Sequence, residues 1–144
     1  MARSILPLTA SDLASITPAI GTIVSSATRV ASVNSSDFVN FKPFAGLMVT
    51  VSITGGNSSG PTLTPAIEAK MGSGTYEDIL GAAAIAASTG AGTHSYVIYP
   101  GATTKTRGDI VSAAPVALPE NWRLAITQSS TRTRAYSAEA IYLT

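Results

Sequence analysis

Few side chains in this sequence could take part in catalysis. His94 is the only histidine, and the chain has no cysteine. A histidine acting as general base needs a nucleophile and an orienting acid, and no sequence signature marks either partner. We therefore interpret His94 as a surface histidine or a hydrogen-bonded structural histidine.

Carboxylates are equally sparse as candidate metal ligands. The eight acidic residues are dispersed, and Glu77 and Asp78 form the one adjacent pair. Neighbouring residues of a strand point to opposite faces, so this pair is poorly placed to chelate one ion. A calcium loop of the D-x-D-x-D type is absent. We expect no metal, no cofactor and no catalytic residue, hence no enzyme, although a paired-carboxylate glycosidase stays open from sequence alone.

Two glycine-rich segments invite a phosphate-loop interpretation. Residues 55–61 read Gly-Gly-Asn-Ser-Ser-Gly-Pro, without the Gly-Lys-Ser/Thr ending of a nucleotide-binding loop. The Gly90-Ala91-Gly92 segment also lacks the spacing of a dinucleotide fingerprint. Both segments are typical of hairpin turns.

Basic residues do not form a concentrated face. Nine Lys and Arg against eight Asp and Glu give a formal charge of +1, whereas a nucleic-acid-binding domain normally carries a basic patch. A hairpin could bring Arg123, Arg132 and Arg134 together. That group could bind phosphate, but a solvated hairpin end or an intersubunit salt bridge fits it better. We expect no nucleic-acid partner.

The aromatic residues offer a third kind of site. Trp122 and four tyrosines could form a platform on which sugars stack; those tyrosines are Tyr96, Tyr99, Tyr136 and Tyr142. Trp122 and Tyr136, however, fall on the apolar sides of their expected strands. Core packing, with the indole N–H or the hydroxyl satisfied, is the better interpretation.

The elements that must position these residues are short strands. In residues 46–54, apolar and mainly polar side chains alternate, with the apolar set being Leu47, Val49, Val51 and Ile53. A period of two in β-branched residues predicts a half-buried strand. Further strands are expected at 28–33 (with a possible extension back to 22–24), 62–71, 75–80, 94–99, 122–128 and 132–143.

Three segments interrupt or complicate this pattern. Pro65 cannot donate to a ladder, which predicts an edge strand or a local bulge. The alanine-rich residues 81–87 are interpreted as a strand end or loop, and residues 102–118 as one long loop. The three phenylalanines, Phe38, Phe41 and Phe44, are expected to plug one end of the core.

About seven strands separated by frequent turns predict an all-β fold, an antiparallel β-sandwich or a small barrel. We divide the chain into an extended N-terminal arm (1–27) and a β-sandwich domain (28–144). Charged residues make up 12% of the chain, about half the usual share of ~25%. Short neutral side chains replace them, and this composition suits a packed assembly.

The arm contains an apolar extended segment that needs cover: Ser4, Ile5, Leu6, Pro7 and Leu8. The segment could tuck into the domain's own core or lie on a neighbouring subunit. Its apolar part is too short for a secretory signal, and no run in the chain approaches the ~18–20 apolar residues of a membrane helix. We expect no membrane partner.

The pattern as a whole resembles small β-sandwich virion proteins encoded by tailed bacteriophages, among them head-decoration (capsid cement) proteins. The similarity covers roughly residues 28–144. It rests on the strand order and on the Leu-Pro-x-x-Trp-Arg stretch at 118–123; the other segments that carry it are 46–51, 64–70, 76–80 and 99–101. No residue of this pattern encodes an activity.

The resemblance implies a structural role without catalysis. Decoration proteins commonly sit as trimers over junctions between capsid subunits and brace the shell, often through a terminal arm. The implied partners are the major capsid protein and further copies of this chain as a homotrimer. The implied location is the capsid surface of the virion, after synthesis in the host cytoplasm, with Ser4 to Leu8 as the binding arm. The alternatives are a tail or fibre-base component and a carbohydrate-binding or adhesion module.

Overall fold

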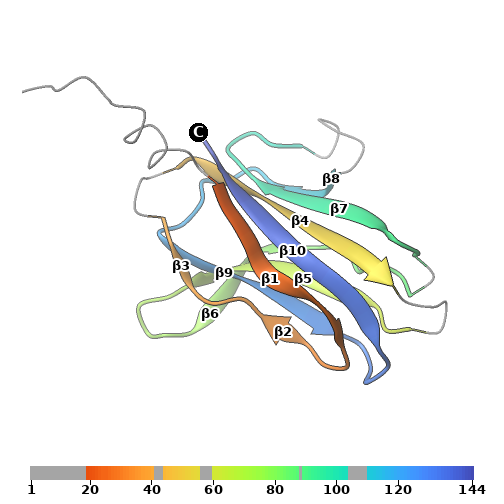
Figure 1. The fold of residues 1–144 in the computed structure, drawn as a ribbon. Helices are drawn as coiled ribbons and strands as arrows, with labels where there is room; N and C mark the ends of the chain where they lie inside the picture. The colour runs from red at the N-terminus through yellow and green to blue at the C-terminus, as the bar shows by residue number, and fades with distance from the viewer. Residues whose placement is uncertain (1–18, 41–43, 56–59, 88, 104–109) are drawn as a thin grey trace, which may run out of the picture.

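Ten strands make up two facing sheets in the computed structural model, which describes residues 19–40, 44–55, 60–87, 89–103 and 110–144 (Figure 1). No helix occurs in these ranges, and so none that could cross a membrane. The strands are β1 Ala19–Arg29, β2 Val33–Asn34, β3 Phe38–Val39, β4 Gly46–Gly55, β5 Leu63–Lys70, β6 Tyr76–Gly81, β7 Gly92–Ile98, β8 Ile110–Ala114, β9 Asn121–Gln128 and β10 Arg134–Leu143. The all-β prediction is confirmed, and the arrangement is a sandwich.

The two sheets differ in strand order and in the strands that form their edges. Sheet A has the order β1-β10-β4-β7-β8, and sheet B the order β2-β9-β5-β6, with β3 also paired to β9. All pairs are antiparallel except β7 with β8, which is parallel. In sheet A, β10, β4 and β7 are central, and in sheet B, β9 and β5 are central. These five strands therefore carry most of the core.

The core lies between the sheets and follows from the two-residue period. In β4, Leu47, Val49, Val51 and Ile53 are buried, as the alternation predicts. Sheet B covers them with its own alternate residues, which include Leu63, Ile67, Trp122, Leu124 and Ile126. A strand whose one face is buried has its register fixed, because a slip of one residue would place every apolar side chain in water.

The first strand lies earlier in the chain than expected. It begins at Ala19 and ends at Arg29, so residues 19–27, which we assigned to the arm, pair with β10 in sheet A. Three register shifts interrupt this pairing, and Gly21 has a φ of +77°. Such irregularities disturb the regular alternation, which explains why the sequence pattern placed the strand at 28–33.

Two further predictions about local structure need correction. The expected loop 102–118 contains β8, whose parallel pairing with β7 needs a crossover and leaves no hairpin signal. Pro65 lies in the interior strand β5 instead of at an edge. Its carbonyl accepts from Ala82 N just beyond the end of β6, so the missing N–H falls where the ladder has ended. The sequence also allowed a local bulge near Pro65, and the pairing of β5 with β6 does shift register between Ile67 and Glu68.

Aromatic rings close one end of the sandwich, as predicted. Phe38 stacks on Trp122 with ring centroids 4.8 Å apart, and Phe44 stacks on Tyr142 at 4.7 Å. The indole N–H of Trp122 donates to the Tyr142 hydroxyl at 3.3 Å. Phe41, the third member of the expected plug, lies outside the described residues.

The burial of β4 gives a direct test of the facing assignment. Val51 has 0% of its surface exposed, so Val51→Asp would place a carboxylate among apolar side chains at a cost of several kcal/mol. We expect loss of cooperative thermal unfolding. Thr54→Asp, at an exposed position of the same strand, should melt close to the parent protein. A normal melting curve for Val51→Asp would contradict the assignment.

Candidate functional site

The segment predicted to bind a partner, Ser4 to Leu8, lies outside the described residues. Within the described residues, the candidate contact surfaces are the outer faces of the two sheets. These faces are set by the strands themselves, because every residue that alternates with a core residue points outward.

The outer face of sheet A is almost uncharged. Glu139 is the one charged residue among the outward side chains of the central strands β4, β7 and β10. On β7 the outward Ser95 and Val97 are themselves buried. Thr50 and Ser95 hydrogen-bond each other across β4 and β7, with their hydroxyl oxygens 3.0 Å apart. The other members are Met48, Ser52, Thr54, Thr93, Val97, Ser137, Ile141 and Leu143.

One end of this face is an apolar groove. The groove has a volume of about 650 Å³ and runs over the ends of three strands, with Met48 from β4, Val97 from β7, and Ile141 and Leu143 from β10. Tyr99 and residues 100–103 complete it. Ile141 is 40% exposed even though it is a large aliphatic side chain. Among the residues that the structure describes, no charged side chain lines the groove.

The wall of the groove depends on a glycine. A Cβ at Gly46 would lie 2.1 Å from the carbonyl oxygen of Ile98 and 2.6 Å from the ring of Tyr99. Glycine therefore lets Tyr99 lie directly against β4. The Tyr99 hydroxyl donates to the backbone oxygen of Thr144 at 3.0 Å, which holds the ring in place.

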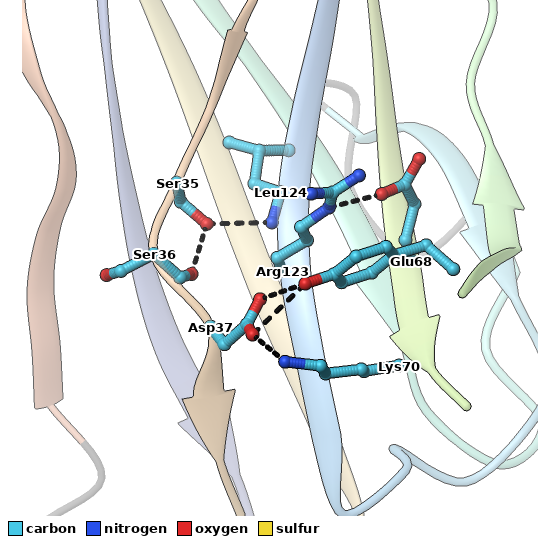
Figure 2. A network of polar contacts seen from close by, with 8 residues as sticks. Ser35, Ser36, Asp37, Glu68, Lys70, Arg123 and Leu124 are labelled. Atoms are coloured by element: carbon cyan, nitrogen blue, oxygen red, sulfur yellow. Dashed lines mark hydrogen bonds and ion pairs between the residues drawn. The ribbon is translucent and has the colours of Figure 1, made fainter. Parts of the chain in front are cut away.

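The outer face of sheet B carries a charged network instead (Figure 2). Asp37 accepts hydrogen bonds from Lys70 Nζ at 2.6 Å and from the Tyr76 hydroxyl at 2.8 Å. Arg123 donates to Glu68 at 2.5 Å, and its guanidinium lies 3.4 Å from the centre of the Tyr76 ring. Two cations and two anions meet here, so the network neutralises itself.

The pKa values of the network follow from these bonds. The hydrogen bond from Lys70, then that from Tyr76, lowers the pKa of Asp37, and Asp37 in turn raises the pKa of Lys70. Both side chains are open to solvent, and exposed ion pairs contribute little to stability. The network is best understood as a solvated surface of sheet B.

The predicted arginine group does not form. Arg123 is engaged on the outer face of sheet B, whereas Arg134 is 1% exposed and points into the interior at the start of β10. Five residues separate Arg123 from the end of β9, which is a distance of roughly 17 Å along a strand. β9 and β10 lie in different sheets, so the connection between them is not a hairpin and leaves the two guanidinium groups apart.

Arg134 is a structural clamp that no sequence pattern indicated. Its Nη1 donates to the carbonyls of Pro61 and Ala86 at 2.8 and 3.0 Å, and its Nη2 donates to that of Thr89 at 2.7 Å. Burial lowers the pKa of Arg134. A buried guanidinium needs several acceptors, and here the backbone of two connecting segments supplies them. Arg134 thereby ties both segments to β10.

His94 lies on the inner side of sheet A, opposite Val51 of β4. Its Nε2 is buried and has no hydrogen-bond partner among the described residues. Burial, with a smaller contribution from the charge of Arg134, lowers the pKa of His94. No group of three or more His, Cys, Asp or Glu side chains suited to a metal occurs in the described part of the chain.

The aromatic residues divide between core and surface. Trp122 and Tyr136 are fully buried, which confirms that they are core residues, and Tyr96 is buried with them. The Trp122 indole N–H has its partner in Tyr142, but the Tyr136 hydroxyl, which was expected to be satisfied, has none among the described residues. Burial raises the pKa of Tyr96 to about 12. Tyr99 and Tyr142 are half-buried, and Tyr99 faces the groove. The platform of five aromatic rings is therefore not assembled.

Sequence reasoning missed the groove, although a signal for it was present. Met48, Val97 and Ile141 are apolar residues at positions where the alternation calls for polar ones. One such exception is ordinary on a protein surface. Three exceptions at the same level of three neighbouring strands mark a patch, but the strand order needed to see this comes from the structure.

A scan of protein-family models found no match to this chain, and a search of curated proteins found no significant relative.

The inward position of His94 predicts a dependence of stability on pH. Its pKa is lower in the folded chain than the ordinary 6.5 expected after unfolding, so the unfolded chain binds the proton more readily. The contribution of neutral His94 to the free energy of unfolding should be fully present above pH 6.5. As the pH drops below 6.5, the free energy of unfolding should fall by at most about 1.4 kcal/mol per pH unit.

Urea unfolding at several pH values between about 8 and 5 measures this slope. His94→Gln removes the titrating group and should flatten the curve in that range. Because the pKa of Asp37 is lowered below its ordinary 3.8, that carboxylate does not contribute here. An equal slope in parent and variant would contradict the assignment.

Proposed function

We propose that this protein is a non-enzymatic structural component of a tailed-phage virion, a decoration protein that binds and stabilises the head shell. The observation that carries the proposal is the contrast between the two outer faces. Sheet B carries a solvated charged network, while sheet A presents short neutral side chains that end in an apolar groove. The proposed contact surface is the outer face of sheet A.

The chemistry of this face suits burial against another protein. Serine and threonine lose little side-chain entropy when they are buried, and without charges they need no ion partner across the interface. Among the outward residues of its central strands, Glu139 alone would require one. Charged residues are in general depleted from the centres of protein interfaces.

The binding partners in this proposal are the major capsid protein and other copies of the chain, as a homotrimer. Such a protein acts through binding energy alone. Each copy makes a modest contact, and the symmetric lattice repeats that contact many times. If the protein binds the expanded shell and not its precursor, mass action stabilises the expanded state.

The resemblance of residues 28–144 to phage virion proteins supports this reading and extends equally to tail proteins. A place on the head is preferred because shell lattices offer the flat repeated surfaces that a neutral sheet face can cover. The binding experiment below therefore also tests whether the protein attaches to the head or to the tail.

Introducing one charge on the sheet A face should weaken attachment. Ser52→Lys places an ammonium group at the centre of this face, on β4. Its matched control is Thr64→Lys, on the interior strand β5 of sheet B and also half-buried. We expect Ser52→Lys to lower occupancy on undecorated head shells by about tenfold or more, the effect of ~1.4 kcal/mol, and Thr64→Lys to leave it unchanged.

Occupancy is measured by co-sedimentation with shells of the phage that encodes the chain, with melting curves to show that both variants fold. Equal occupancy for the two variants would contradict the proposed face. Binding of the parent protein to tails, with none to heads, would contradict the decoration role and favour a tail component. Absence of binding to either structure would contradict a virion role.

Removal of residues 1–10 should separate folding from attachment. The two described sheets are built from residue 19 onward, so the truncated protein should still fold and unfold cooperatively. If Ser4 to Leu8 contribute to the contact with the shell, occupancy should fall at a protein concentration that saturates the parent. Unchanged occupancy would contradict the role of the arm.

A further inference from the structure

The apolar groove on sheet A lies where the N-terminal segment enters the fold. Ala19, the first residue of β1, pairs with Ile141 of β10, and Ile141 lines the groove. The chain before Ala19 therefore starts from the rim of the groove. We propose that in the free protein Ile5, Leu6 and Leu8 occupy the groove of their own chain. This inference does not rest on the proposed virion role.

The length of the connecting segment fits this occupant. Ten residues, 9–18, join Leu8 to Ala19, and a flexible chain of that length has an end-to-end distance of roughly 17–19 Å. From β1 the groove begins one strand away, at β10, and extends over β4 and β7. At the usual strand spacing this is about 5–14 Å. The connection reaches without being stretched.

The chemistry of the segment also matches. Residues 4–8 are uncharged, as are the described side chains that line the groove. Arg3 precedes the segment, and Glu139 is exposed on β10 beside Ile141, on the same face. An apolar segment with a flanking cation thus meets an apolar groove with a flanking anion.

Concentration decides between this chain and a second copy as the source of the segment. A short flexible connection gives an effective concentration in the millimolar range. At micromolar protein, docking within one chain is then favoured by about a thousandfold over docking between chains. The same contacts could be exchanged between neighbours in a crowded lattice, as in domain swapping.

Engineered cysteines test the proposal cleanly, because the chain has none of its own. The test pair is Leu6→Cys with Ile141→Cys, and the control pair is Leu6→Cys with Thr127→Cys, which is exposed on the outer face of sheet B. A short bis-maleimide is added to dilute protein. We expect intramolecular cross-linking at least about tenfold faster in the test pair, because the groove holds residue 6 close to residue 141.

Each result of this experiment has a definite meaning. Cross-links within one chain, found by peptide mapping, support the proposal. Cross-links between chains would overturn it and show that the segment occupies a second copy. Equal rates for the test and control pairs would also overturn it.

A second measurement avoids substitutions in the groove. A synthetic peptide of residues 1–10 is added to the protein that lacks them, and amide NMR signals are followed. Shifts confined to Met48, Val97, Ile141 and their neighbours support the proposal, and their absence overturns it. Neither measurement uses shells, so failure here is distinguishable from failure of the proposed function.

Discussion

The packing of one sheet face against the other is the constraint on which this structure depends. Because side chains alternate along a strand, each strand can give one row to the core and must leave the other row outside. The inner rows of β4 and β10 are fully buried from Leu47 to Ile53 and from Arg134 to Ala140. Their outer rows do not take part in this packing between the sheets, so requirements other than the core can set their composition.

The end of the sandwich near the start of β10 shows how polar groups are accommodated inside. Arg134 donates hydrogen bonds to three carbonyl groups from two connecting segments, so a side chain holds these segments where no strand pairing does. His94 stays near this cation, and both burial and the cation favour its neutral form. The opposite end is closed by stacked rings of Phe38, Trp122, Phe44 and Tyr142. One end is thus held by the hydrogen bonds of a buried cation and the other by the burial of aromatic rings. Only the first end contains a charged group.

Regular alternation made most of the fold predictable from the sequence, and its failures have physical causes. The strands β4, β5, β9 and β10 follow the two-residue period and were expected close to where they lie. β6 and β7 were also expected close to where they lie, although their burial does not alternate. β1 was placed too late in the chain, at 28–33 with a possible extension to 22–24, because its pairing shifts register three times. β8 escaped because parallel pairing depends on a distant crossover and not on a local turn. Arg134 was expected at a solvated hairpin end. Its buried position could not be predicted, because no local pattern shows that the carbonyls of residues 61, 86 and 89 converge on it. The groove could not be predicted, because its residues come from three strands whose order is a property of the sheet.

The difference between the two outer rows is therefore the most informative feature for function. Charged residues on an exposed sheet keep a protein soluble and oppose unwanted association, and the outer row of sheet B carries them in a closed network. The corresponding row of sheet A holds one charged residue on its three central strands and an apolar groove at its end. If solubility alone shaped the surface, both rows would be expected to carry charge. Only the outer face of sheet A has a composition that suits burial, and this face lies next to the point where an apolar segment enters the fold. Both features are expected of a protein whose sheet A face is covered by another surface.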